Sequence, residues 1–182
     1  MSESKSIILH IDRIVPVSFK DIGAELLTID GLSIIWEDAR SIALSAIDMS
    51  RVCLKLIIET EEAHPVDANT LLARNITLLQ KEGYILLDAK VLETLLLHPE
   101  NITKEWYTVA DSDTVEQSSI EFRGTVLNKG VSAEEIIFTL SYARGYWHYG
   151  WSNTFYDAQD LESFSKDSWA PLRRHVAVLK PA

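Results

Sequence analysis

Residues 142–156 read YARGYWHYGWSNTFY and hold seven of the sixteen aromatic side chains of the chain. Within this segment Trp147, Tyr149 and Trp151 alternate, which is the spacing of side chains on one face of a β-strand. The pair Arg144-Gly145 stands where a turn into that strand is needed. The segment therefore predicts a β-hairpin with a strongly aromatic face.

Two more strands are predicted before the aromatic strand, which makes the last third of the chain a β-meander. Alternating residues that share one face of each strand are Ile120, Phe122, Gly124 and Val126 in the first, and Ile136, Phe138, Leu140 and Tyr142 in the second. Gly124, inside a strand, predicts a bulge or room for a facing aromatic side chain. A turn is expected at 128–130, and a last strand over 175–179 is expected to close the sheet.

The first third of the chain also reads as strands. Alternating apolar residues predict strands over 6–11, 24–29, 32–36, 41–47 and 52–58. Asp30-Gly31 separates the second and third of these and suits a two-residue hairpin turn. The fifth segment also fits a short helix that begins at Ser50.

The middle of the chain is predicted to be helical. Asp67 can cap a helix whose apolar face holds Leu72, Ile76 and Leu79, and Gly83 can end it. A second helix is expected between the capping residue Asp88 and Leu97, with Val91, Leu92, Leu95 and Leu96 directed inward. Residues 99–117 read as a polar connection around Trp106.

These elements predict an α+β fold, with antiparallel strands at both ends of the chain and two central helices packed on the aromatic C-terminal meander. We expect one integrated domain over residues 1–182. Its parts are a β-rich segment 1–60, a helical segment 61–117 and the meander 118–182.

Several segments match a pattern seen in uncharacterised bacterial proteins. They are EDARSIAL at 37–44, YILLDAKV at 84–91, PENI at 99–102 with Glu105-Trp106, FRGTVL at 122–127, WHY at 147–149 and AVL at 177–179. The chain thus resembles this group over most of its length, but residues 157–175 are polar where the group has a shorter, Gly-rich stretch. The resemblance implies one integrated fold and no particular activity.

The net charge is −10, and the excess of acidic residues lies in the middle of the chain. Residues 61–117 hold eleven Asp and Glu against four Lys and Arg, whereas residues 118–182 hold seven of each kind. Nucleic acids are bound through clustered Lys and Arg, which this sequence lacks, so direct nucleic-acid binding is not expected. The acidic middle predicts either a solvated surface or a contact with a basic protein partner.

Cys53 is the single cysteine, so the chain forms no internal disulfide, as is usual in a reducing compartment. Its neighbours Val52 and Leu54 predict a partly buried thiol. The sequence has no apolar run of the ~18 residues needed for a membrane span, and its start lacks the pattern of a secretory signal. We therefore expect a cytoplasmic location without membrane insertion.

Two groups of side chains on the aromatic hairpin are candidates for binding. Trp147, Tyr149 and Trp151 could stack a sugar or another small molecule, unless this face packs against the Leu-rich helices. The opposite face is then expected to be exposed and to bind a protein partner. Its side chains include Tyr146, His148, Arg123, Glu121, Thr139 and Ser152.

Other constellations give weaker signals for chemistry. His10 and Asp12 share a strand face but lack further identifiable metal ligands, and Asp111, Asp113 and Glu116 lack the glycine of a calcium loop. The sequence contains no phosphate-binding, dinucleotide-binding, zinc-protease or nucleophile-elbow motif, so no metal or cofactor is expected.

The composition and motifs favour a non-enzymatic interaction protein, such as an inhibitor, an immunity-type protein or an adaptor. The alternative is a module that binds a small molecule or carbohydrate through exposed aromatic rings of 146–151. A third hypothesis is a hydrolase with His148 as general base. The sequence does not identify the partner, the ligand or the oligomeric state.

Overall fold

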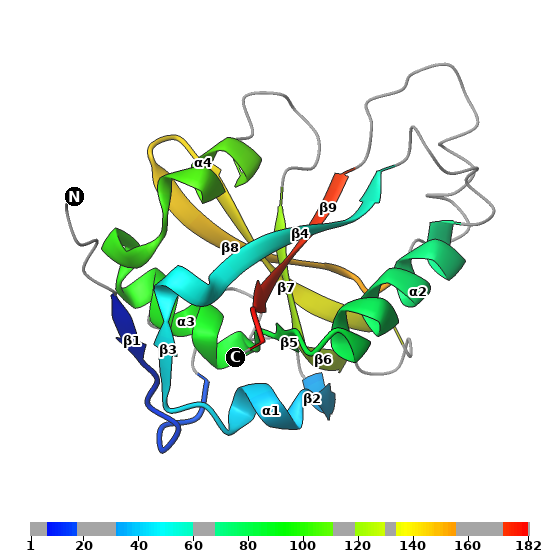
Figure 1. Cartoon of the computed structure of the whole chain (residues 1–182), viewed down its shortest axis with the longest axis horizontal. Coiled ribbons are helices and arrows are strands. Elements are labelled where there is room, and N and C mark those ends of the chain that lie inside the picture. Colours follow the sequence, from blue (N-terminus) through cyan, green and yellow to red (C-terminus); the bar gives the residue numbers. More distant parts are fainter. Residues whose placement is uncertain are drawn as a thin grey trace.

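The computed structural model describes residues 7–17, 32–59, 68–110, 119–129, 134–155 and 173–181. The elements in chain order are β1 (Ile8–His10), β2 (Leu32–Glu37), α1 (Ala39–Ile42), β3 (Ala46–Asp48), η3 (Met49–Arg51), β4 (Val52–Glu59), α2 (Ala68–Lys81), β5 (Ile85–Leu86), α3 (Ala89–Leu97), η5 (Pro99–Asn101), α4 (Lys104–Ala110), β6 (Ile120–Lys129), β7 (Glu135–Ala143), β8 (Tyr146–Asn153) and β9 (Arg173–Leu179) (Figure 1).

The described strands form one large and one small sheet. The large sheet has seven strands in the order β4-β9-β6-β7-β8, with β2 paired to β6 and β5 paired to β9. Its pairs are antiparallel except for β6 with β9. β1 and β3 form the small antiparallel sheet. The α+β class predicted from the sequence is confirmed.

Different helices cover the two faces of the large sheet (Figure 1). On one face, α3 lies against β6 and β8, and α4 and the small sheet contribute to the same core. On the other face, Leu72 and Leu79 of α2 pack against Ile57 of β4 and Val176 of β9. The prediction placed both central helices on the aromatic strands, but α2 packs mainly on β4 and β9.

The predicted helix ends and several strands are confirmed. Asp88 caps α3, because its carboxylate accepts hydrogen bonds from the amides of Lys90 at 2.9 Å and Val91 at 3.0 Å. α3 ends at Leu97, and α2 ends two residues before Gly83. The predicted strand 52–58 is β4 and the predicted meander is β6–β8. Asp67, the predicted cap of α2, lies outside the described residues.

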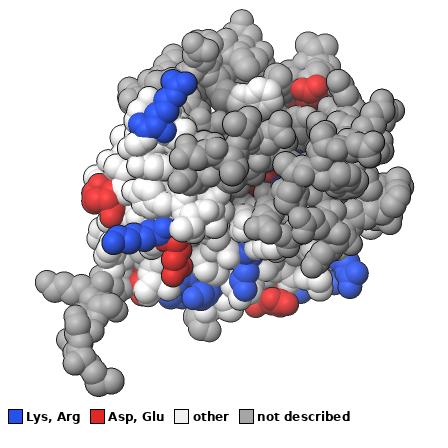
Figure 2. Space-filling model, turned by 90° about the horizontal axis from the view of Figure 1, so that it is seen from above, with Lys and Arg blue, Asp and Glu red and all other residues white. Residues whose placement is uncertain are grey.

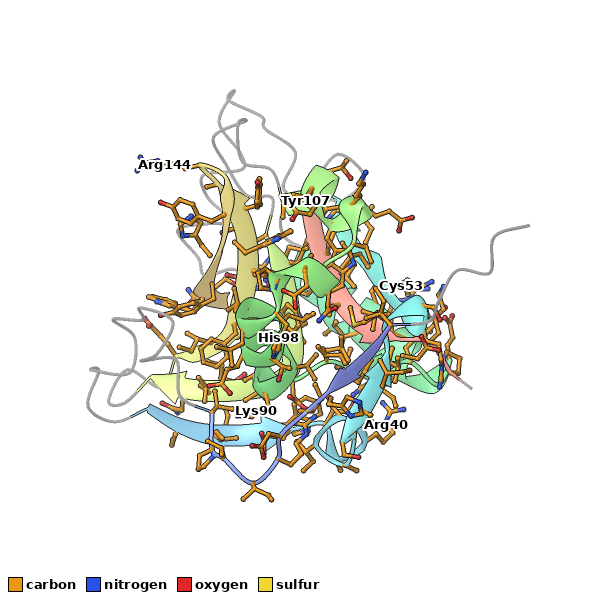
Figure 3. The ribbon with its side chains drawn as sticks, turned by 90° about the vertical axis from the view of Figure 1, so that its left-hand side faces the viewer. Arg40, Cys53, Lys90, His98, Tyr107 and Arg144 are labelled. Atoms are coloured by element: carbon orange, nitrogen blue, oxygen red, sulfur yellow. The ribbon has the colours of Figure 1, made fainter. Side chains whose placement is uncertain are left out.

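The β7–β8 hairpin turns through the predicted pair Arg144-Gly145. Both residues have positive φ, 53° and 90°, which is the backbone of a tight two-residue hairpin turn. Figure 3 shows Arg144 projecting from the tip of this hairpin.

Residues 41–45 are not the strand that the alternation of apolar residues predicted. They belong to α1 and the chain that follows it, and only Ala46–Asp48 is a strand. Asp38 caps α1 by accepting from the amide of Arg40 at 3.0 Å, and the hydroxyl of buried Ser41 donates to Asp88 at 2.7 Å. The helix cap and this tertiary hydrogen bond thus outweigh the alternation of apolar residues, which by itself favours a strand.

The predicted polar connection over 99–117 is also wrong where it is described. Residues Lys104–Ala110 form α4, whose buried face holds Trp106 and Ala110, four residues apart. Trp106 packs on Phe122 of β6 with ring centroids 6.3 Å apart. Burial of these side chains in the core explains a helix in a segment of polar composition.

The last strand does not close the sheet. β9 lies inside it, between β4 and β6, because its apolar residues Val176, Ala177 and Val178 are fully buried on both faces. The first strand of the hairpin predicted around Asp30-Gly31, residues 24–29, lies outside the described residues. Its second strand is β2, which pairs with β6.

The predicted bulge at Gly124 is confirmed and joins three parts of the fold. Phe122 pairs with Phe138 but Val126 pairs with Ile137, so three residues of β6 are extra. Within this bulge, the amide of Gly124 donates to Leu87 O and its carbonyl accepts from the amide of Asp38, both at 2.9 Å.

Replacing Gly124 with alanine is expected to destabilise the protein strongly. The new Cβ would lie 2.4 Å from Leu86 O and 2.7 Å from Asp88 N, and backbone atoms cannot move aside as a flexible side chain can. We expect a loss of about 3 kcal/mol or more in the free energy of unfolding, measured by urea titration.

Gly150→Ala is the matched control in the same sheet, because its Cβ would meet the side-chain hydroxyl of Thr139 at 3.1 Å. Its cost should stay below about 1 kcal/mol. Equal effects of the two substitutions would contradict the role given to Gly124.

Candidate functional site

A pocket opens on the α2 face of the large sheet, between α2 and the paired strands β2 and β6. Its volume is about 310 Å³, at the lower end of the range of about 300–1,000 Å³ typical of small-ligand sites. The described residues that line it are Ile35, Trp36, Ala73, Ile76, Gln80, Leu86, Arg123, Val126, Glu135, Thr154 and Phe155.

Burial distinguishes the floor of this pocket from its rim. Leu86, Arg123 and Thr154 are buried and form the floor, and Arg123 is only 5% exposed. Ile35 (47% exposed), Trp36 (41%) and Phe155 (41%) form the rim. Large apolar side chains with this much exposure, gathered around one opening, are typical of a binding site rather than of an ordinary surface.

Local irregularities of the chain build the pocket walls. In β2, Ile34 pairs with Leu127 and Trp36 with Val126, so Ile35 is an extra residue in a β-bulge. Because a bulge interrupts the strict alternation of faces, the consecutive residues Ile35 and Trp36 both reach the pocket.

The helical wall comes from one face of α2. Ala73, Ile76 and Gln80 are spaced by three and four residues, which places them on the same side of the helix. The helix is fixed to the sheet by buried Leu72 and by the side-chain amide of Asn75, which donates to Ile57 O at 2.7 Å.

Buried charges lie beside the pocket floor. The guanidinium of Arg123 donates through Nε to Oε2 of Glu121 at 2.5 Å and through Nη2 to Thr154 O at 2.8 Å. The other oxygen of Glu121 lies 3.3 Å from Nη1 of Arg174. One carboxylate is therefore shared by two guanidinium groups, inside a part of the protein where charge is poorly solvated.

Two polar groups of the floor keep unused hydrogen-bonding capacity. Nη1 of Arg123 makes no hydrogen bond with any described residue. The Thr154 hydroxyl Oγ1 is buried and has no partner among the described residues either. A buried polar atom without a partner, such as Oγ1 of Thr154, is unusual in folded proteins and calls for an explanation.

The predicted exposed face of the meander is only partly exposed. Tyr146 is 55% exposed, and its ring lies 4.4 Å from that of half-buried His148. Glu121, Arg123 and Thr139 are buried, so the expectation that they lie on an exposed face is wrong. They belong to β6 and β7, which have strands on both sides, whereas β8 ends the described strand order.

The three alternating aromatic residues of β8 do not form one open platform. Trp147 packs against Tyr142 of β7 and Tyr107 of α4, with centroids 5.1 and 4.7 Å apart. Tyr149 also packs against the core, and Trp151 is 39% exposed. Trp147 and Tyr149 therefore pack on the core, as the alternative left open by the sequence expected for this face, but Trp151 is exposed and the ring contact of Trp147 is with α4 rather than with a Leu-rich helix.

The remaining candidates give no site among the described residues. Asp12 accepts from the amides of Ile14 and Val15, and no three His, Cys, Asp or Glu side chains in the described ranges are placed to hold a metal ion. Nε2 of His148 lies 3.2 Å from Ala143 O, and His148 does not line the pocket. Asp111, Asp113 and Glu116 lie outside the described residues.

The structure describes only part of the acidic middle segment. Residues 68–110 hold five acidic and four basic residues, and the other six acidic residues of 61–117 lie outside the described ranges. On the face in Figure 2, described Lys and Arg side chains are interspersed with Asp and Glu. No described helix is both long enough and apolar enough to cross a membrane.

Sequence reasoning identified Arg123 and Glu121 as functional candidates but missed the pocket. The available signal was two opposite charges, two residues apart, that alternate with the apolar residues Ile120 and Phe122. Such a pair in a central strand must be buried and ion-paired. The contributions of β2 and α2 gave no comparable signal, because Ile35, Ala73 and Ile76 read as ordinary apolar residues.

Cys53 is half-buried on the α2 face, as predicted, and burial raises the pKa of its thiol, opposed by the charges of Lys180 and Lys55. Folding thus disfavours the reactive thiolate. We expect alkylation by iodoacetamide to be slower in the folded protein, with its pH midpoint higher than in urea-unfolded protein. Equal midpoints would contradict this assignment.

Comparison of the chain with known proteins found no match among family models, curated proteins or solved structures. The pocket between α2 and β2 and the buried charges at its floor are therefore the features that bear on function.

Proposed function

We propose that the protein binds a small, largely apolar ligand in the pocket between α2 and β2. The observation that carries the proposal is the ring of exposed side chains, Ile35, Trp36 and Phe155, around a buried floor. A ligand that covers these side chains removes their apolar surface from contact with water, which is the main driving force for apolar binding. The proposal assigns binding and no reaction.

The pocket walls are held in place before a ligand arrives. β6 lies between strands on both sides, and α2 is fixed by Leu72 and by the hydrogen bond from Asn75 to Ile57. A ligand therefore orders few protein groups, which lowers the entropic cost of binding. The polar residues in the walls, Gln80, Arg123, Glu135 and Thr154, are suited to orient it.

The uncharged dye N-phenyl-1-naphthylamine, which fluoresces in apolar surroundings, tests the proposal. The wild-type protein should enhance its fluorescence in a saturable titration. Ala73→Trp should abolish the enhancement, because a large side chain on this wall fills the pocket.

Leu78→Trp is the matched control, since Leu78 is an exposed apolar residue of α2 that does not line the pocket. It should bind the dye like the wild type. Saturable binding that Ala73→Trp leaves intact would place the dye elsewhere and contradict the proposal.

A second candidate function is contact with a protein partner through Tyr146 and His148. The favouring observation is the exposure of Tyr146 on β8, with its ring supported by that of His148. Amphipathic aromatic side chains of this kind supply much of the energy of protein interfaces. With one cysteine and no disulfide, a reducing location such as the cytoplasm suits this role.

Affinity capture from native lysate tests the second candidate. A stoichiometric partner retained by the wild type should be lost with Tyr146→Ala and with His148→Ala. Lys81→Ala, at an exposed end of α2 far along the chain, should retain it. A partner that all three variants retain would rule out this surface as the contact.

A further inference from the structure

We infer that the ligand is an aliphatic monocarboxylate whose carboxylate binds Arg123 at the pocket floor. The inference rests on the proposed function and adds the chemical class of the ligand. It follows from the placement of one buried guanidinium group at the inner end of a pocket that is otherwise mostly apolar.

The first argument is the geometry of Arg123. Nε donates to the carboxylate of Glu121 and Nη2 donates to the carbonyl oxygen of Thr154, while Nη1 makes no hydrogen bond with the described residues. These two contacts hold the guanidinium rigid, so its remaining donors are fixed at the floor. A carboxylate is the ligand group that matches guanidinium donors best in charge and shape.

The second argument is the local charge. Glu121 divides its two oxygens between Arg123 and Arg174, so Arg123 has only Oε2 as its carboxylate partner among the described residues. Because Arg123 is buried, its positive charge acts on a ligand at the floor with little screening by water.

The third argument is the hydroxyl of Thr154. Its oxygen has no partner among the described residues, although Thr154 lines the floor and its carbonyl already accepts from Arg123. The hydroxyl can donate to a second carboxylate oxygen after a rotation of its side chain. One ligand group would then satisfy both unused donors of the floor.

Glu135 limits the ligand to a single negative charge. It is exposed and lines the pocket near the rim, where its carboxylate disfavours a second anionic group on the outer part of the ligand. The rim itself consists of Ile35, Trp36 and Phe155, which suits a hydrocarbon chain. A chain of medium length is compatible with the volume of about 310 Å³.

Displacement of N-phenyl-1-naphthylamine from the wild-type protein at pH 8 tests the inference. The probes are decanoate, decan-1-ol and decyltrimethylammonium, each used at a concentration at which it is monomeric in solution. All three have the same ten-carbon chain, and they differ in the charge of the head group. Partition into a purely apolar site would favour the alcohol, because burying a charge is costly. We expect decanoate to bind at least roughly tenfold more tightly than decan-1-ol.

The outcomes separate this inference from the proposed function. If decan-1-ol binds as tightly as decanoate, or decyltrimethylammonium more tightly, the carboxylate assignment is wrong although the pocket binds apolar ligands. If none of the three displaces the dye and the dye itself does not bind, the proposed function fails as well.

Substitutions of pocket residues show which side chains cause the preference for decanoate over decan-1-ol. Arg123→Met keeps an unbranched apolar stem but removes the guanidinium, and should remove the preference for decanoate over decan-1-ol. Thr154→Val, nearly equal in shape, should weaken decanoate a few-fold. Glu135→Gln should strengthen it, since a negative charge near the chain is removed.

Thermal unfolding of each variant accompanies these measurements, because Arg123→Met also removes a partner of Glu121. If that variant does not fold, Thr154→Val and Glu135→Gln decide the question. Opposite shifts of the decanoate affinity, each measured relative to the decan-1-ol affinity of the same variant, support the inference. Unchanged decanoate affinity in both overturns it.

Discussion

The backbone contact at Gly124 is the constraint on which the rest of the structure depends. At this residue the main chain of β6 touches the segment Leu86–Asp88 so closely that no side-chain carbon fits between them. Hydrogen bonds from Gly124 to Leu87 and from Asp38 to Gly124 fix the start of α1 and the start of α3 on the same strand. Since both helices begin at buried aspartates, one close approach sets the position of two helix caps.

The bulge around Gly124 also divides β6 between two neighbours. Its first residues pair with β9, and the residues after the bulge pair with β2. Arg123 lies where this change of partner takes place, and its side chain reaches the pocket on the α2 face. The strand irregularity that admits the Leu86–Asp88 segment thus lies next to Arg123, and Leu86 and Arg123 both line the pocket floor.

Three of the four buried acidic residues in the described ranges have different roles. Asp38 and Asp88 accept hydrogen bonds from helix amides and from Arg40 and Arg13, respectively, so their charges are compensated by local structure. Glu121 instead holds two guanidinium groups, one of which borders the pocket. Buried ion pairs add little net stability compared with apolar packing, so the Glu121–Arg123 pair is weak evidence for a stabilising role, and its place beside an apolar pocket is what the proposed binding function builds on.

The sequence by itself determined the elements whose signals are local. The cap of α3, the apolar faces of α2 and α3, the meander β6–β8, the Arg144-Gly145 turn and the bulge at Gly124 follow from residue type and spacing. Only the tertiary structure decided that residues 41–45 leave the strand pattern, that Lys104–Ala110 is helical and that β9 lies inside the sheet. It also decided that Arg123 is buried beside a pocket, because Ile35, Ala73 and Thr154 meet there from distant parts of the chain. Local propensity carries no information about which distant surfaces bury one another, and burial is what turns an alternating charge pair into a candidate binding site.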